Sequence, residues 1–264
     1  EYSAFGPTQN PAAPGKIPGG SSSGSAAAVA AEFCDAALGS DTGGSVRNPA
    51  SHCEIVGIKP SYGRCSRFGM VAFASSLDQA GTLARNVWDA SLGLQSIMGH
   101  DPMDSTCVNE KVPNLTQSLD QSKPQDLKSK KIGIPKNHQS LGLNPEMLQA
   151  FDHTIEELKK FGCVIQEVDL PLNNESITVY YLVAVSEASS NLSRYDGVRY
   201  TTRATEYNDI SELYSKSRAE GFGDEVKRRI ILGTYALSAG YYDAYYLKAC
   251  KVRKLIQTSF KKAF

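Results

Sequence analysis

Two short segments rich in glycine and serine contain the residue types that could attack a carbonyl group. The first presents Ser21 directly after two glycines, and the second, residues 39–45, ends at Ser45. Glycine adopts backbone conformations closed to residues with a Cβ atom, so these segments can hold a serine hydroxyl at a sharp corner. We also expect successive backbone N–H groups of the second segment to converge as in an anion nest or oxyanion hole. The donors would be Thr42, Gly43, Gly44 and Ser45. The pair of segments predicts serine chemistry on a carbonyl carbon.

A serine nucleophile needs a proton acceptor. Of the four histidines only His52 lies near the serine segments, seven residues after Ser45, and a single histidine is more often a packing or surface residue than a base. The alternative is a second serine that relays the proton to a desolvated lysine, because a buried lysine can lose its proton near neutral pH. Two serine segments would then act together.

Two other motifs, a nucleophile elbow and a phosphate-binding loop, fit this part of the sequence less well. Residues 20–24 match the G-x-S-x-G nucleophile elbow, which needs a strand before it and a helix after it. A helix follows, but the proline-containing residues 12–18 cannot form a central strand, which disfavours an α/β-hydrolase. Lys16 follows a glycine but precedes Ile17 rather than Ser or Thr, which excludes a phosphate-binding loop.

The surrounding sequence predicts the elements that must position the two segments. We expect a helix over 26–33, begun by a serine N-cap, and a buried strand over 35–40 that leads into the second segment. A short helix over 45–50, a strand over 55–60 and an amphipathic helix over 86–98 follow. Residues 100–125 read as a polar surface excursion. A β-α-β unit is predicted from residues 131–135, 145–161 and 164–168, and mainly helix from residue 179.

Composition narrows the class of protein. A chain of 264 residues with 41% hydrophobic residues can bury a sizeable core, and we expect a single domain over 1–264. Lys+Arg and Asp+Glu both number 28, so no overall field attracts nucleic acid or an anionic membrane. The six cysteines form no C-x-x-C pair, which predicts reduced, mostly buried thiols in a reducing compartment and no structural metal. No apolar run is long enough to span a bilayer.

The paired motifs resemble the signature of the amidase signature family. They are residues 19–28 (Gly-Gly-Ser-Ser-Ser-Gly-Ser-Ala-Ala-Ala) and residues 39–50 (Gly-Ser-Asp-Thr-Gly-Gly-Ser-Val-Arg-Asn-Pro-Ala). Within that family, residues 56–63, 74–79, 186–197, 220–223 and 227–229 resemble the A subunits of glutamyl-tRNA(Gln) amidotransferases. The resemblance implies an α/β fold with a mixed, mostly parallel sheet covered by helices on both faces.

The resemblance also implies roles for individual residues. Ser45 would be the acyl-forming nucleophile and Ser21, after a cis Gly20–Ser21 peptide bond, the bridging serine, with the two hydroxyls within hydrogen-bonding reach. Backbone amides of Thr42 to Ser45 would bind the oxyanion. Tyr180 and Arg229, or Arg228 one position earlier, would bind glutamine, because a guanidinium suits its α-carboxylate. Independently of the resemblance, we expect Arg47 and Asp41 to brace the second segment rather than to contact substrate.

The implied function is a glutaminase that supplies ammonia for converting Glu-tRNA(Gln) to Gln-tRNA(Gln). Its partners would be a B subunit, which uses ATP and Mg²⁺ to activate the tRNA-bound glutamate, and a small C subunit. The glutaminase component itself would hold no cofactor and no metal and would contact no membrane. The expected location is a bacterial cytoplasm or the interior of a mitochondrion or chloroplast.

The chain departs from the family pattern in two respects. The family's catalytic lysine lies upstream of the first serine segment, and Lys16 is too close to Ser21 to replace it, so we expect an internal piece of the fold that lacks the lysine segment and the C-terminal part. Ser23 stands where the family commonly has glycine. Two alternatives stay open: a stand-alone amidase acting on another amide, and a catalytically silent scaffold subunit.

Overall fold

The computed structural model describes residues 3–136, 142–172 and 174–264. Its contacts divide the chain into two compact units. Unit 1 comprises residues 1–116 and 180–246, and unit 2 comprises residues 117–179 and 247–264. The single-domain assignment stays a prediction, and each unit is described by itself.

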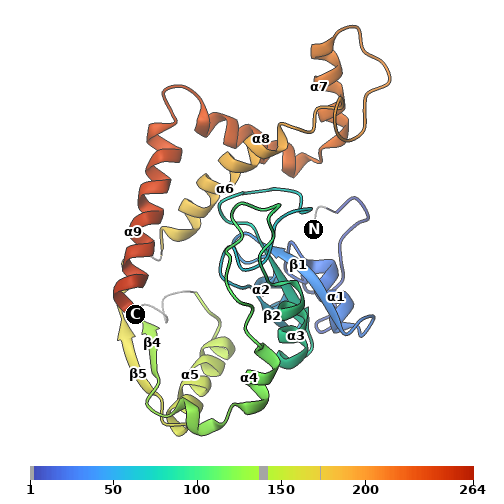
Figure 1. Cartoon of the computed structure of the whole chain (residues 1–264). Helices are drawn as coiled ribbons and strands as arrows, with labels where there is room; N and C mark the ends of the chain where they lie inside the picture. The colour runs from blue at the N-terminus through green and yellow to red at the C-terminus, as the bar shows by residue number, and fades with distance from the viewer. Residues whose placement is uncertain (1–2, 137–141, 173) are drawn as a thin grey trace. The chain divides into compact units, whose positions relative to one another are not determined.

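Unit 1 contains a three-stranded antiparallel sheet in the order β1-β3-β2; its outer strands β1 and β2 are labelled in Figure 1. Its strands are β1 (Ala36–Asp41), β2 (Val56–Ile58) and β3 (Gln79–Ala84). The central strand β3 is buried along almost its whole length. Because β1 ends at Asp41, it delivers the chain directly into the second serine segment.

Helices cover both faces of this sheet. Leu83 of β3 packs with residues of α1 (Ser23–Ala30) and α2 (Arg47–His52) in a buried cluster that includes Val29 and Ala50. The neighbouring residue Thr82, which points to the opposite face, donates its hydroxyl to the carbonyl of Ala90 in α3 (Val87–Ile97) at 2.8 Å. The expectation of helices on both faces is therefore confirmed for this sheet.

Unit 2 contains the predicted β-α-β unit. Strands β4 (Lys131–Pro135) and β5 (Val164–Val168) pair in parallel, and α5 (Pro145–Lys160) connects them (Figure 1). The side chain of Asn144 caps the start of α5 by accepting the Met147 N–H at 2.8 Å. Here the alternation of strand and helix patterns predicted the element bounds to within one residue.

The remaining elements are mainly helical. Residues 100–125, expected to be a polar surface excursion, include the short helix α4 (Leu115–Gln121) and the start of the 3₁₀ helix η1 (Pro124–Leu127). From residue 176 onward the described elements are α6 (Ser176–Leu192), α7 (Ile210–Gly221), α8 (Asp224–Leu237), the π-helical turn η3 (Asp243–Leu247) and α9 (Lys248–Ala263). No helix among the described residues is both long enough and apolar enough to cross a bilayer.

Three expectations need correction. Instead of one mixed, mostly parallel sheet, the described strands form two separate sheets: β4 and β5 pair in parallel, whereas β1, β2 and β3 pair antiparallel. The prediction that a serine side chain caps α1 is wrong. Ser22 occupies the N-cap position, but its side chain makes no capping hydrogen bond and instead accepts the Ser40 N–H of β1. Residues 100–125 are not only a surface excursion, since Asp104 and Cys107 are buried.

All six cysteines are free thiols and four are buried, as predicted.

Candidate active site

The second serine segment forms a tight loop around a buried carboxylate. Asp41, at the end of β1, is fully buried and accepts the backbone N–H of Gly44 at 2.7 Å and that of Val46 at 3.1 Å. Arg47 adds two side-chain bonds to the same carboxylate, each 3.0 Å. Burial alone would raise the pKa of Asp41, but the hydrogen bonds from Arg47, Val46 and Gly44 outweigh burial and lower this pKa below its usual value. The predicted bracing role of Asp41 and Arg47 is confirmed.

The same bonds correct one of the predicted oxyanion donors. Of the four amides predicted to converge, the Gly44 N–H is already donated to the carboxylate of Asp41. The amides of Thr42, Gly43 and Ser45 donate to no acceptor within the described part of the chain. These three amides, rather than the Gly44 amide, are available to a substrate oxygen.

The first serine segment lies against the second. The Gly20–Ser21 peptide bond is cis, as the resemblance implied. The next residue, Ser22, donates its backbone N–H to the carbonyl of Ser45 at 3.1 Å, and the Gly20 N–H donates to Asn48 Oδ1 at 3.0 Å. The two segments, 24 positions apart in sequence when counted from serine to serine, are therefore in direct contact.

Glycine is required where the two segments meet. Gly19 has φ +74°, and a Cβ atom there would lie 2.6 Å from Asn48 Oδ1 and 2.9 Å from Pro49 Cα. A Cβ atom on Gly39 of β1 would lie 2.7 Å from the Ser22 hydroxyl oxygen. The glycines thus permit a close backbone approach that side chains would block.

The two candidate catalytic hydroxyls are accessible. Ser21 is exposed and Ser45 is half-buried, and neither hydroxyl has a hydrogen-bond partner among the described residues. The structure therefore has no hydrogen bond between the two hydroxyls, and the looser contact expected in the absence of substrate stays a prediction.

The two predicted glutamine-binding residues reach the same region from α6 and α8. The ring of Tyr180 lies against Gly43, so closely that a Cβ atom on Gly43 would be 2.5 Å from Tyr180 Cε2. Burial raises the pKa of Tyr180, while the nearby charge of Arg229 opposes that shift. The Arg229 guanidinium stacks 5.8 Å from the centre of the Phe73 ring, and its Nε donates to Glu225 at 2.9 Å.

These contacts distinguish Arg229 from its neighbour. Arg228 also pairs with Glu225, but its side chain is 65% exposed, against 35% for Arg229, and no aromatic contact or interaction with Tyr180 is found for it in the described structure. Arg229 is therefore the better candidate.

The histidine considered as a base has packing contacts instead. The ring of His52 lies 3.4 Å from Asn48 Nδ2 and 3.4 Å from the Ile17 carbonyl oxygen, and its own carbonyl accepts the Asn10 side chain at 2.7 Å. His52 thus joins the residues that precede the first segment to α2. No group of three His, Cys, Asp or Glu side chains that could hold a metal ion occurs among the residues described.

Sequence reasoning missed two residues beside the site. Asp78 accepts the Thr42 hydroxyl at 2.8 Å, although the two residues are 36 positions apart. Half-buried Lys59 donates to the Pro60 carbonyl, and burial, with the nearby Arg47 charge, lowers the pKa of Lys59. The sequence showed the motifs that contain Lys59 and Asp78, but no local pattern shows that Asp78 contacts Thr42 or that Lys59 lies near the charge of Arg47.

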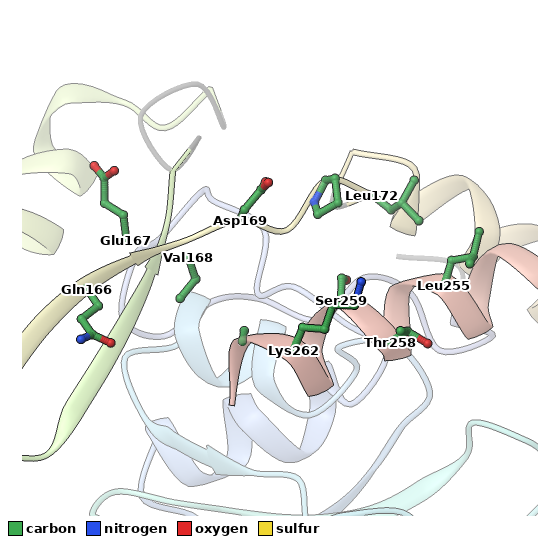
Figure 2. Close-up of a pocket in the computed structure, with 11 residues that line it drawn as sticks. Gln166, Glu167, Val168, Asp169, Leu172, Leu255, Thr258, Ser259 and Lys262 are labelled. Carbon is green, nitrogen blue, oxygen red and sulfur yellow. The ribbon is translucent and has the colours of Figure 1, made fainter.

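Unit 2 contains a cavity of about 770 Å³. Its lining comes from β5, the segment that follows β5, and α9 (Figure 2). The lining residues are Gln166, Glu167, Val168, Asp169, Pro171, Leu172, Leu255, Thr258, Ser259, Lys262 and Ala263. None of the predicted site residues is among them, so the cavity contributes nothing to the assignment.

Comparison with known proteins identifies relatives along the whole chain. The family model described as "Amidase" matches residues 1–264. The A subunit of glutamyl-tRNA(Gln) amidotransferase from Akkermansia muciniphila is 55% identical over 264 residues, and that from Carboxydothermus hydrogenoformans is 57% identical. Each alignment covers all of this chain but 55% and 54% of the relative, so the chain spans about half the length of the curated relatives it matches.

Solved structures of amidases are similar to this chain in fold. The crystal structure of the A subunit of glutamyl-tRNA(Gln) amidotransferase from Thermotoga maritima is 40% identical, with a TM-score of 0.76, over 99% of this chain and 51% of that one. A peptide amidase in complex with the competitive inhibitor chymostatin is 28% identical, with a TM-score of 0.73, over 94% of this chain and 50% of that one. The fold is the α/β fold that these amidases share.

Proposed function

The chain belongs to the amidase family, and from this membership we propose that it forms the serine-bearing part of a glutaminase, the A subunit of a glutamyl-tRNA(Gln) amidotransferase. The observation that carries the proposal is the hydrogen bond from the Ser22 N–H to the Ser45 carbonyl, which holds the two serine segments together. A pair of adjacent serines is what a relay from a nucleophile to a distant base requires.

In the proposed mechanism, the Ser45 hydroxyl attacks the side-chain amide carbon of glutamine. Ser21 takes the proton from Ser45 and passes it toward a lysine, and the proton returns to the leaving nitrogen as the carbon–nitrogen bond breaks and ammonia departs. Water then attacks the acyl-ester on Ser45 and releases glutamate. The lysine is proposed from family resemblance, and no described lysine forms a hydrogen bond with either serine.

The oxyanion of the tetrahedral intermediate would be bound by backbone amides. Those of Thr42, Gly43 and Ser45 support this role because they carry no acceptor in the described structure. The hydrogen bonds that the Gly44 and Val46 N–H groups donate to Asp41 support it too, since a loop fixed in advance needs no reorganisation when charge develops.

Tyr180 and Arg229 would select glutamine. Arg229 Nε is engaged by Glu225, which leaves both terminal nitrogens of the guanidinium for the α-carboxylate of the substrate. Tyr180 packs on Gly43 of the nucleophile loop, so a substrate held by Tyr180 would be next to Ser45.

The partners are also proposed by analogy with the relatives. A B subunit would use ATP and Mg²⁺ to activate the glutamate of Glu-tRNA(Gln) and a C subunit would complete the heterotrimer, while the protein that carries this chain would hold no cofactor. The proposed location is a bacterial cytoplasm or the interior of an organelle, where thiols stay reduced, and all six cysteines are free.

The test is a glutaminase assay on the full-length protein that carries these 264 residues, with and without B and C subunits. We expect ammonia release from glutamine, loss of several orders of magnitude in Ser45→Ala and Ser21→Ala, and labelling of Ser45 by a serine-directed probe. Turnover of unrelated amides without preference for glutamine would favour the stand-alone amidase. A protein that binds its partners while Ser45 resists labelling would favour the scaffold.

A further inference from the structure

The nucleophile loop, residues 42–45, is fixed at both ends by buried carboxylates. Asp41 accepts the Gly44 and Val46 amides at the far end of the loop. At the near end, Thr42 donates its hydroxyl to Asp78 Oδ1 at 2.8 Å. The backbone between these attachments contains the Thr42 and Gly43 amides that have no acceptor within the described residues.

Asp78 is itself held rigidly. Only 5% of its surface is exposed. Its carboxylate accepts the Phe73 N–H at 2.8 Å and the Ala74 N–H at 3.0 Å, in addition to the Thr42 hydroxyl. Two of these donors are backbone N–H groups that fix the carboxylate of Asp78. Because Thr42 donates to the same carboxylate, the position of the Thr42 side chain depends on the position of residues 73–78.

Residues 73–78 are in turn attached to α6. Glu187 accepts the Ser76 N–H at 2.9 Å and the Ser76 hydroxyl at 2.6 Å. Asn191, one turn further along α6, donates to the Phe73 carbonyl at 3.1 Å and to the Ser75 hydroxyl oxygen at 2.9 Å. The same helix carries Tyr180, and the Phe73 ring stacks on Arg229.

We propose that Asp78 is a positioning residue that sets the Thr42 end of the nucleophile loop relative to the glutamine-binding residues, acting through the hydroxyl of Thr42 and anchored to α6 by Glu187 and Asn191. The proposal rests on the proposed function for what the loop binds. A purely structural Asp78 would affect stability alone. A positioning Asp78 also lowers kcat when it is lost, because a misplaced loop fails in the transition state even when glutamine is bound.

The experiment compares two substitutions at Thr42 in the full-length protein. Thr42→Val keeps the shape and removes the hydroxyl, whereas Thr42→Ser keeps the hydroxyl and removes a methyl group. We expect Thr42→Val to lower kcat for glutamine by roughly tenfold to a hundredfold, the factor that corresponds to one hydrogen bond to a charged group, with KM changed less than about threefold. Thr42→Ser should recover most of the lost rate.

Thr82→Val is the matched control. Thr82 is buried, and its hydroxyl donates to the Ala90 carbonyl at the same 2.8 Å, but this bond joins β3 to α3. The control should lower the free energy of unfolding as Thr42→Val does and leave kcat within about twofold.

A double-mutant cycle then tests whether Asp78 is the group through which Thr42 affects kcat. If Thr42 acts through Asp78, Asp78→Asn in the Thr42→Val background should lower kcat much less than Asp78→Asn alone. Additive losses, a wild-type kcat in Thr42→Val, or an equal loss in Thr42→Ser would each overturn the proposal.

A second readout separates this proposal from the proposed function. If the wild-type protein releases no ammonia from glutamine, the glutaminase assignment fails, and the positioning role is judged by amide hydrogen exchange of residues 42–46 in the same full-length protein. Faster exchange in Thr42→Val but not in Thr42→Ser or Thr82→Val supports the proposal, and unchanged exchange in Thr42→Val overturns it.

Discussion

Adding a single methyl group at Gly43 should disturb the site through Tyr180. A Cβ atom there would lie 2.5 Å from Cε2, 2.7 Å from Cζ and 2.9 Å from Cδ2 of the Tyr180 ring, whereas ordinary contacts are 3.4–4 Å. The backbone of Gly43 is not in the left-handed region, so alanine is conformationally allowed and the clash is with the ring alone. The ring must therefore move by about 1 Å.

Two measurements report that movement. Urea unfolding of the full-length protein should show a loss of about 1–3 kcal/mol in Gly43→Ala, the usual cost of overpacking. In the same protein, kcat/KM for glutamine should fall by roughly a hundredfold, because a displacement of this size in a substrate-positioning group has that effect.

Gly24→Ala is the control in the neighbouring segment. A Cβ atom on Gly24 meets nothing within 4 Å, and Gly24 lies in α1. This variant should therefore gain about 0.5–1 kcal/mol, since alanine favours a helix over glycine. Combining Gly43→Ala with Tyr180→Ala should restore part of the lost stability but not the activity. A Gly43→Ala protein with wild-type stability and kinetics would refute the packing of Tyr180 on the loop.

Three further outcomes are expected. Burial alone would raise the pKa of Asp104, but hydrogen bonds from the Arg67 N–H and from Thr106 outweigh burial and lower this pKa from 3.8 to about 2. The carboxylate therefore stabilises the fold above pH 3.8, and this contribution is lost as the pH falls toward 2. Asp104→Asn should lower the free energy of unfolding by about 2 kcal/mol at pH 7, and a loss that persists unchanged down to about pH 2 would contradict this. Arg229→Gln should raise KM for glutamine at least about tenfold, and an equal rise in Arg228→Gln would show that the two arginines are not distinguished. The 264-residue chain alone should release ammonia orders of magnitude more slowly than a full-length protein that supplies the lysine, and robust activity abolished by Ser45→Ala would point to a base within these residues, His52 first.

Local patterns predicted most of the fold. The strand that ends at Asp41, the amphipathic helix capped by Asn86 and the β4-α5-β5 unit all follow from periodicity and capping residues, which depend on neighbours in sequence. Neither the central strand β3 nor its antiparallel pairing with β1 and β2 was predicted. Because β3 is buried along almost its whole length, its sequence lacks the alternation of apolar and polar residues that indicates a half-buried strand.

The site was predicted in part, for a similar reason. Residue types and spacing pointed to the two serine segments, and the resemblance assigned the roles of Ser21 and Ser45, which stay predictions. The contacts by which Asp41 braces the loop are present in the structure. The sequence did not show that the Gly44 amide would be donated to Asp41, because it indicates that amides can converge but not which acceptor each one meets. The contact of Thr42 with Asp78 depends on how a distant loop folds back, and no local rule supplies that information.

Because Asp41 accepts the Gly44 and Val46 amides, the far end of the loop is attached to an anion of the chain itself, without any ligand. A free phosphate or sulfate ion could reach those two amides only by displacing a carboxylate that is held by a bidentate Arg47 pair. Ordering entropy is thus lost before substrate arrives, and little further loss accompanies the binding step. An inhibitor for this loop would then benefit from a rigid oxyanion mimic matched to the Thr42 and Gly43 amides more than from a flexible, highly charged group.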